Sequence, residues 1–246
     1  MTLMTLAQRK AEVEGRIAEA CRRVGRDPSE VGVIAVTKYV SLERTQEALA
    51  AGCRHLGENR WQDAREKWLT LADEHGEGGS ENGSKAPIWH FIGSLQSNKV
   101  KDVVGRFTYI HSLDRLPLAE AIHRKASSLG IMVPCFIQVN VSGEESKHGL
   151  TPDGLQELAL GLRDYPSIQP IGLMTMAPHE EDPELTRPVF RRLRELRDEA
   201  NRLGWFLEPL TELSMGMSND FEVAIEEGAT RVRLGTILVG KEEELM

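Results

Sequence analysis

The sequence predicts an α/β fold, a single (β/α)8 TIM barrel with an extra N-terminal helix, and two observations lead to it. Eight short apolar runs recur along the chain, and nearly all are separated by segments with helical spacing. The runs are continuously apolar, as expected of parallel strands covered on both faces. Eight such repeats in 246 residues fit one closed barrel, so we expect residues 1–246 to form one domain. An open doubly wound sheet is the alternative, which the lack of GxGxxG after the first run disfavours.

The expected strands are short and rich in β-branched residues. The first covers residues 31–37 and reads VGVIAVT. The others cover residues 54–57, 88–92, 107–111, 133–141, 168–173, 212–215 and 230–234.

The expected helices lie between these runs, after a leading helix over residues 5–25. They cover residues 41–51, 60–71, 97–103, 114–129, 152–165, 184–203 and 220–227. Ser41 and Thr151 are expected to cap helices, because a side-chain oxygen can accept from the first free amides. Pro152 suits a first helical position, where no amide proton is needed.

One segment, residues 73–87, is rich in glycine and polar residues and reads DEHGEGGSENGSKAP. Few of its side chains could join a core, so it is expected to be a flexible insertion. It joins a helix to the next strand, and in a barrel such loops lie on the face away from the active site.

Composition and charge exclude several classes of protein. The chain has 30 Lys+Arg and 38 Asp+Glu, a net charge of −8, which argues against a general nucleic-acid binder. No apolar run approaches the ~18 residues of a membrane helix, and the N-terminus does not resemble a signal peptide. The three cysteines, Cys21, Cys53 and Cys135, are odd in number and far apart, so we expect free thiols and a cytoplasmic location.

Candidate functional residues follow the strands, because the loops at the carboxyl ends of barrel strands carry active sites. Lys38 ends the first strand, where burial would favour a neutral amine that attacks an aldehyde; the alternative is a lysine that reaches solvent. The loops at 214–218 (SMGMS) and at Gly235 and Thr236 follow the last two strands, where barrels often bind phosphate. Arg233 would point into the mouth and need an acceptor, either on a ligand or in an internal salt bridge.

Other kinds of site are poorly supported. The seven histidines show no HxH or HExxH spacing, so no metal site is expected. His90 is expected to be a hydrogen-bonded barrel residue, whereas His55, His75, His123 and His179 are expected to face solvent. No GxSxG elbow marks a hydrolase.

Taken together, the motifs resemble the pyridoxal phosphate homeostasis proteins, which are similar to the N-terminal barrel domain of alanine racemase. The resemblance covers nearly the whole chain. The matching stretches are AVTK at 35–38, GEN at 57–59, WHFIGSLQSNK at 89–99, VNVSGEESKHG at 139–149, GLM at 172–174 and LSMGMSNDFEVAIEEGATRVRLGTILVG at 213–240. The chain departs from the family pattern in its long insertion and in Tyr39 and Val40, where a small polar residue and proline often follow the lysine.

The resemblance implies that Lys38 holds pyridoxal 5′-phosphate (PLP) as a covalent aldimine, a Schiff base. It also implies a phosphate cradle built from two loops, which contain Ser214, Met215, Gly216, Gly235 and Thr236. Around the ring it implies Arg233 facing the pyridine nitrogen, Met174 packing on the ring and Asn59 at the mouth.

The function that the resemblance implies is intracellular PLP homeostasis by a binding protein, not an enzyme. Alanine racemases use a second base from a C-terminal domain, and a chain ending at Met246 is expected to lack it. The expected partners are PLP and the apo forms of PLP enzymes, with no nucleic acid and no membrane, and the expected state is a monomer. Two alternatives stay open: a PLP-dependent amino-acid racemase, and a Schiff-base aldolase on a barrel.

Overall fold

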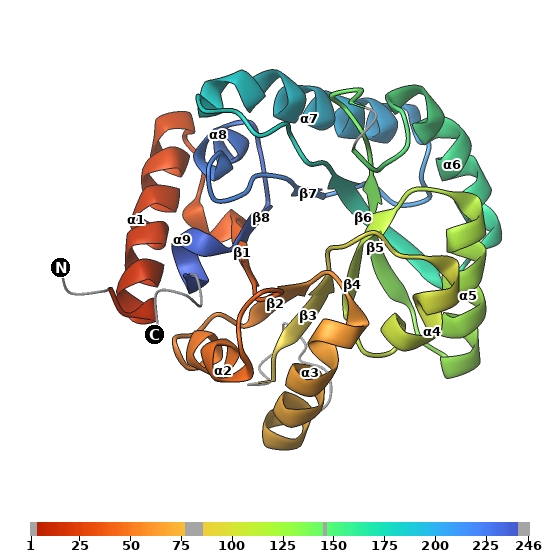
Figure 1. Cartoon of the computed structure of the whole chain (residues 1–246). Coiled ribbons are helices and arrows are strands. Elements are labelled where there is room, and N and C mark those ends of the chain that lie inside the picture. The colour runs from red at the N-terminus through yellow and green to blue at the C-terminus, as the bar shows by residue number, and fades with distance from the viewer. Residues whose placement is uncertain (1–3, 77–85, 145–146, 241–246) are drawn as a thin grey trace.

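The chain folds as a closed barrel of parallel strands surrounded by helices (Figure 1). This computed structural model describes residues 4–76, 86–144 and 147–240. Neighbouring strands pair in sequence order, and β8 pairs with β1, which confirms the predicted barrel and excludes the open sheet. The strands are β1 (Gly32–Val36), β2 (His55–Glu58), β3 (Ile88–Phe91), β4 (Tyr109–Leu113), β5 (Val133–Gln138), β6 (Ile168–Met174), β7 (Glu212–Ser214) and β8 (Arg231–Leu234).

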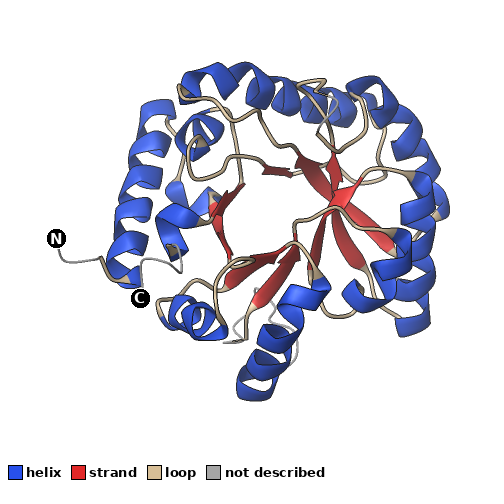
Figure 2. Cartoon of the chain, viewed as in Figure 1, coloured by secondary structure: helices blue, strands red, loops and turns tan. Residues whose placement is uncertain are grey.

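Helices form the outer layer, drawn in blue around the red strands in Figure 2. The α-helices are α1 (Leu6–Val24), α2 (Leu42–Ala50), α3 (Trp61–His75), α4 (Val100–Val103), α5 (Leu116–Leu129), α6 (Leu155–Gly161), α7 (Arg187–Leu203), α8 (Phe221–Glu226) and α9 (Thr236–Val239). Short 3-10 helices cover Pro28–Glu30, Ser97–Lys99, Pro152–Gly154, Leu162–Asp164 and Pro183–Thr186.

The predicted extra N-terminal helix is confirmed as α1. It begins with a capping box, in which the Thr5 side chain accepts from the Gln8 amide and the Gln8 side chain accepts from the Thr5 amide. It ends at Val24 and is capped by Gly25, whose φ of 69° is readily adopted by glycine. The helix packs outside the barrel against α8 and α9, near the pairing of β8 with β1 (Figure 1).

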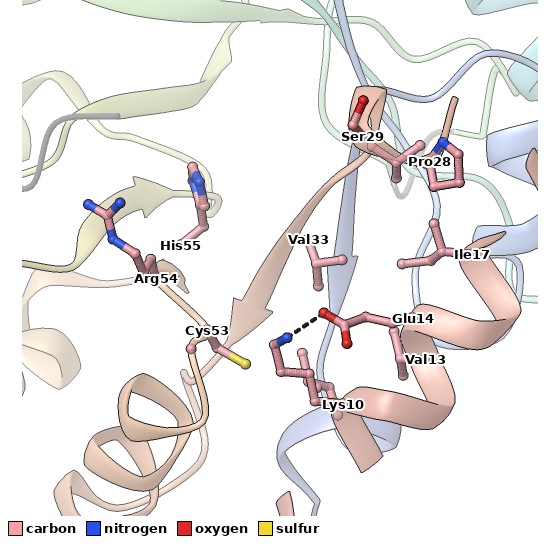
Figure 3. Close-up of a pocket in the computed structure, with 13 residues that line it drawn as sticks. Lys10, Val13, Glu14, Ile17, Pro28, Ser29, Val33, Cys53, Arg54 and His55 are labelled. Atoms are coloured by element: carbon pink, nitrogen blue, oxygen red, sulfur yellow. Dashed lines mark hydrogen bonds and ion pairs between the residues drawn. The ribbon is translucent and has the colours of Figure 1, made fainter. Parts of the chain in front are cut away.

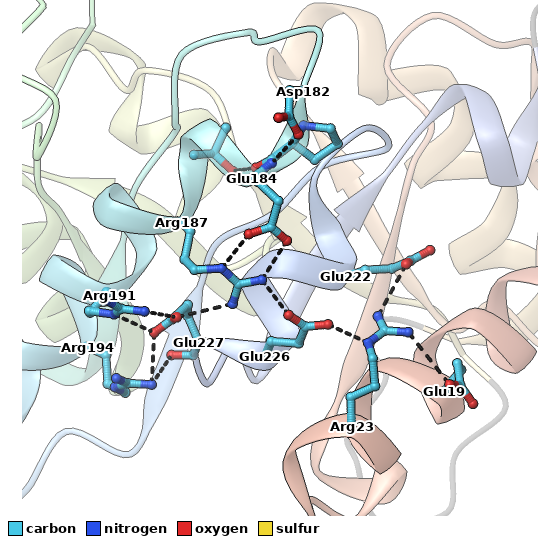
Figure 4. Close-up of polar contacts among 12 residues, drawn as sticks. Glu19, Arg23, Asp182, Glu184, Arg187, Arg191, Arg194, Glu222, Glu226 and Glu227 are labelled. Atoms are coloured by element: carbon cyan, nitrogen blue, oxygen red, sulfur yellow. Dashed lines mark hydrogen bonds and ion pairs between the residues drawn. The ribbon is translucent and has the colours of Figure 1, made fainter.

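Ion pairs fasten α8 to its neighbours on both sides (Figure 4). Glu226 at the end of α8 pairs with Arg23 of α1 at 2.6 Å and with Arg187 of α7 at 2.5 Å. Glu227 lies only 5% exposed and pairs with three arginines of α7, namely Arg187, Arg191 and Arg194. This network holds in place the helix that follows the β7 loop.

A few expected elements differ in their bounds. The α3 helix continues to His75, past the expected end at residue 71, so the expected insertion overlaps its last turn. Residues 77–85 of that insertion lie outside the described residues. Ser41 caps α2 as predicted, accepting from the Arg44 amide at 3.2 Å. Thr151 makes no side-chain cap, and the chain there forms a 3-10 turn over Pro152–Gly154 before α6 begins.

Candidate functional site

Lys38 lies directly after β1, at the carboxyl end of the barrel. The chain turns here, with the Val40 amide donating to the Thr37 carbonyl at 3.1 Å. The Lys38 side chain is half-buried, and its Nζ lies 4.8 Å from the centre of the Tyr39 ring, which is 78% exposed. Among the described residues, no carboxylate forms an ion pair with Lys38. The amine is therefore held near the mouth without an acidic partner.

Beneath Lys38, a buried polar cluster fixes the end of β1. The Thr37 hydroxyl donates to Oε1 of Glu58 at 2.7 Å, and Nζ of Lys67 donates to the same oxygen at 3.0 Å. Lys67 also donates to the Thr37 carbonyl at 2.6 Å. Burial raises the pKa of Glu58 above its usual value, and the nearby Lys67 charge offsets part of this rise. This cluster was not predicted from the sequence. The signal that could have indicated it is Lys67, which lies on the buried face of α3 among apolar residues.

The β1–β8 pairing brings the β8 loop beside Lys38. Ile34 is opposite Arg233, and a Cβ built on Gly235 would lie 3.8 Å from Cβ of Val36. Lys38 follows Val36 by two residues. The predicted lysine and the predicted phosphate loop are thus neighbours at the same edge of the barrel.

Arg233 is buried inside the barrel mouth, with 4% of its surface exposed. Its Nη1 donates to Oγ of Ser214 at 2.7 Å, and its Nη2 donates to the Thr175 carbonyl at 2.9 Å. Burial lowers the pKa of the guanidinium to about 10, partly offset by the Asp220 charge, so it stays protonated near neutral pH. The internal salt bridge, one of the two alternatives for Arg233, is not found among the described residues, where its hydrogen-bond acceptors are a hydroxyl and a carbonyl.

The structure separates the two serines of the SMGMS loop. Ser214 is the last residue of β7, fully buried, and its hydroxyl contacts Arg233 and His111. Ser218 lies half-buried in the loop, where its Oγ accepts from the Gly235 amide at 3.3 Å. The Ser214 hydroxyl, which the resemblance places at the phosphate, thus contacts two buried side chains, and its contact with a phosphate stays a prediction. Sequence reasoning did not single out Ser218 for that contact.

The loop after β7 is tightly packed at its glycine. Gly216 has a φ of 91°, and a Cβ there would lie 2.6 Å from Cβ of Ala224 on α8. Asp220 closes the loop by accepting from the Met217 amide at 2.6 Å. Met215 is fully buried in the hydrophobic core, so only its backbone remains for a ligand. Glycine at position 216 allows the loop to lie against α8.

The remaining predicted residues lie at the same end of the barrel. Met174 ends β6, pairs with Ser214 and is 1% exposed. Asn59 follows β2, is half-buried and lines a cavity of about 710 Å³. The Gly93 backbone packs on Asn59 so closely that a Cβ would lie 2.3 Å from the Asn59 carbonyl oxygen. Thr236 begins α9 and is exposed.

Two features are absent from the described part of the chain: clusters of metal-ligating side chains and helices that could span a membrane. No group of three or more His, Cys, Asp or Glu side chains there is placed to hold a metal ion. No helix in that part is long and apolar enough to cross a membrane. Cys21, Cys53 and Cys135 are free thiols and buried.

Proteins with similar sequences align with almost the whole chain. Residues 12–243 match the family described as alanine racemase, N-terminal domain. A pyridoxal phosphate homeostasis protein of Aquifex aeolicus is 44% identical over 97% of this chain and 99% of its own length. Another, from Pseudomonas aeruginosa, is 41% identical over 97% of this chain and 96% of its own length.

Solved structures with a similar fold include a protein of the same kind. PipY of Synechococcus elongatus with PLP bound is 36% identical, with a TM-score of 0.75, over 91% of this chain and 100% of its own. An alanine racemase of Clostridium difficile has a TM-score of 0.67 over 92% of this chain and 55% of its own; at 17% identity it supports the fold alone. The chain belongs to the pyridoxal phosphate homeostasis protein family, with the fold of the alanine racemase N-terminal domain.

Proposed function

We propose that this chain binds PLP at the barrel mouth through a Schiff base to Lys38 and serves PLP homeostasis in the cell without turning over amino acids. The observation that carries the proposal is the half-buried amine of Lys38, which has no acidic partner among the described residues and lies beside the β8 loop. A relative that is 36% identical over most of the chain holds PLP in its structure. That ligand favours PLP over the phosphorylated sugar of a barrel aldolase.

Lys38 supplies the nucleophile. With PLP bound, the Lys38 amine would supply the nitrogen of a C=N bond to the aldehyde carbon, and the aldehyde oxygen would leave as water. The reaction is reversible, since water can restore the aldehyde and the free amine. Reversibility suits a protein that stores PLP and passes it to apo enzymes, which we propose as the recipients.

Arg233 suits the ring nitrogen of PLP. A guanidinium has five N–H groups, and the bonds to Ser214 and Thr175 use two of them, which leaves three for a ligand. When bound, PLP supplies an aldehyde and a ring that withdraws electrons best when its nitrogen is protonated. Arg233 would donate to that nitrogen while remaining charged itself, which would keep the nitrogen unprotonated. The site therefore binds PLP but is poorly equipped for carbanion chemistry.

The phosphate fits the loops after β7 and β8. Ser218 offers a hydroxyl, and Gly235 offers an amide already directed at that hydroxyl. Thr236 begins α9, and the first amides of a helix have no partner within it. We propose Ser218, Gly235 and Thr236 as the phosphate contacts, with Gly216 shaping the loop, Met174 against the ring and Asn59 at the mouth.

We propose further that the protein acts as a monomer in the cytoplasm. The location is supported by the three cysteines, which are buried as free thiols, as a reducing compartment would keep them. Light scattering on the purified, PLP-loaded protein tests the monomer: a mass near 27.5 kDa is expected, and twice that mass would contradict it.

The binding proposal is tested by borohydride reduction of the purified protein with PLP. We expect a visible absorption band, its loss on reduction, and a mass increase on the peptide that contains Lys38. Lys38→Ala should abolish the band, and Lys99→Ala, a lysine on another loop of the same barrel end, should keep it. Recovery of the label mainly on Lys99, or no label at all, would contradict the proposal.

A further inference from the structure

Three histidines from consecutive strands form a hydrogen-bonded row inside the barrel. Nδ1 of His55 lies 2.9 Å from Nε2 of His90, and Nδ1 of His90 lies 2.9 Å from Nε2 of His111. Nδ1 of His111 is 2.9 Å from Oγ of Ser214, which accepts from Arg233. Since β4 and β7 are not neighbours in the barrel, the contact of His111 with Ser214 crosses its interior. The row runs from the first residue of β2 to the arginine at the mouth.

The imidazoles of His90 and His111 are held in place by stacking and are uncharged. His90 stacks on Tyr109 with ring centres 4.7 Å apart, and His111 stacks on Phe136 at 4.2 Å. Both histidines are fully buried. Burial lowers their pKa values well below the usual range; neighbouring histidines add to this for His90, as does Arg233 for His111. Each ring therefore donates through one nitrogen and accepts through the other.

The number of donors and acceptors in the row determines which nitrogen donates in each hydrogen bond. A guanidinium only donates, so Arg233 occupies one lone pair of the Ser214 oxygen. The Ser214 hydroxyl has one proton, and its other hydrogen-bond contact within the described residues is Nδ1 of His111. His111 then carries its proton on Nε2 and donates to His90. His90 likewise carries its proton on Nε2 and donates to Nδ1 of His55.

The opposite order of donors and acceptors along the row is disfavoured. His111 would then donate to Ser214, and the serine oxygen would accept from both His111 and Arg233. Its own proton would need a third partner, and the described contacts of Ser214 offer none. A buried hydroxyl proton without an acceptor costs about 1–3 kcal/mol.

We propose that His55, His90 and His111 form a proton-ordered relay that positions the Ser214 hydroxyl and, through it, the Arg233 guanidinium toward the ligand. The histidines are positioning residues, because they act on the ligand only through Arg233. The proton order concerns the protein alone, whereas the effect on the ligand rests on the proposed PLP function.

The outer end of the relay lies at the opposite end of the barrel. His55 is half-buried and begins β2, where it lines a cavity of about 470 Å³ together with Lys10, Cys53 and Arg54 (Figure 3). In the direction derived above, the last proton of the row is on Nε2 of His55. Three hydrogen bonds thus link His55 in this cavity to Ser214, and a fourth links Ser214 to Arg233 at the mouth.

The proton order is tested without any ligand. A long-range 1H–15N spectrum of protein labelled with 15N-histidine reports which ring nitrogen carries the proton. At pH 7 we expect His90 and His111 to be neutral and protonated on Nε2, with their signals assigned from the spectra of His90→Gln and His111→Gln. A proton on Nδ1 of either ring, or on both nitrogens, would overturn the relay.

The positioning role is tested with PLP on two variants of one residue. His111→Phe keeps a ring against Phe136 but removes the acceptor for Ser214, and we expect PLP to bind about tenfold more weakly with a shifted absorption maximum. His111→Gln offers an amide oxygen to Ser214 and an N–H to His90, so binding and spectrum should return toward those of the unsubstituted protein. Equal behaviour of the two variants, whether unchanged or equally impaired, would overturn the positioning role. If the unsubstituted protein did not bind PLP, the proposed function would fail, and the spectrum of the ligand-free protein would still decide the proton order.

Discussion

Nζ of Lys67 donates to the carbonyl oxygen of Thr37 at 2.6 Å, one residue before Lys38. Lys67 comes from α3 in the outer layer, and it also pairs with Glu58 at the end of β2. A helix outside the barrel therefore fixes the backbone that carries the proposed Schiff-base lysine. Both members of the ion pair are buried, with side-chain exposures of 8% for Lys67 and 0% for Glu58.

Lys67→Met should destabilise the fold. The substitution leaves the Glu58 carboxylate buried without its cation, and breaking a buried ion pair in this way lowers the free energy of unfolding by about 3–5 kcal/mol. Urea denaturation followed by circular dichroism measures the change. Lys101→Met, on the exposed surface of α4, is the matched control and should change the free energy by less than about 0.5 kcal/mol. Equal stabilities of the two variants would show that the pair does not support the turn at Lys38.

Stability should fall as the pH drops below about 6.5, the usual pKa of histidine in an unfolded chain. The folded-state pKa values of His90 and His111 are well below that value because both rings are buried. In this window the unfolded chain binds protons that the folded chain does not, so acid favours unfolding. Each histidine contributes a slope of up to about 1.4 kcal/mol per pH unit.

The measurement is the free energy of unfolding between pH 7.5 and pH 5. His90→Gln should remove about half of the slope that the two buried histidines contribute, because a glutamine side chain does not titrate. His75→Gln changes an exposed histidine at the end of α3 and should leave the slope unaltered. A slope that His90→Gln does not reduce would mean that His90 is not held neutral in the fold.

Glu227→Gln should loosen the attachment of α8 to α7. Burial by itself would raise the pKa of Glu227, but hydrogen bonds from Arg191 and Arg187 outweigh it and hold the pKa below its usual value. The partners are partly exposed, so we expect a loss of only about 1–2 kcal/mol in the free energy of unfolding. The contribution is present above the unfolded pKa and is lost as the pH falls through the folded one.

The control for Glu227 is Glu195→Gln. Glu195 is 53% exposed and pairs with Arg192 of the same helix at 3.7 Å, an arrangement that contributes little. Chemical denaturation at pH 7 and again at pH 4 should show a difference between the variants that shrinks in acid. A difference that is the same at both pH values would assign the effect to packing.

Ser218 and Ser214 should differ in how they affect PLP and pyridoxal. Ser218→Ala removes a proposed phosphate contact, so PLP binding should weaken at least tenfold, as expected for a hydrogen bond to a charged group, and pyridoxal binding should stay unchanged. Ser214→Ala acts through Arg233 at the ring, so it should weaken both ligands by a similar factor. Dissociation constants from absorbance titrations decide this. A phosphate-specific loss in Ser214→Ala alone would instead support Ser214 as the phosphate contact, as the sequence predicts.

The fold could be predicted from the sequence because each strand is covered on both faces. Continuous apolar runs such as 31–37 have that pattern, and their number fits a closed barrel. Lys38 could be singled out because it directly follows the first run. The sequence could not show which serine of 214–218 enters the barrel, since that depends on where β7 ends, at Ser214.

The histidine row could not be predicted for a different reason. His55 and His90 are 35 residues apart, and His111 and Ser214 are 103 apart, so no local spacing reveals their contacts. Only the closed barrel brings these side chains together. The sequence predicts that His55 faces solvent, which is wrong, because the structure shows it half-buried against His90.

The PLP-loaded protein should not exchange the α-proton of amino acids at enzymatic rates. Exchange needs a general base, and a positioned base typically contributes ~10²–10⁴-fold in rate. Among the three tyrosines, Tyr39 lies beside Lys38 but is 78% exposed, whereas Tyr109 is stacked on His90 inside the barrel. Arg233 also keeps the ring nitrogen unprotonated in the proposed complex. The measurement is loss of the α-proton signal of alanine and serine in deuterated buffer, followed by NMR. Exchange at tens of turnovers per second that is lost in Tyr39→Phe, with PLP still bound, would make Tyr39 a catalytic base and the protein an amino-acid racemase rather than a PLP carrier.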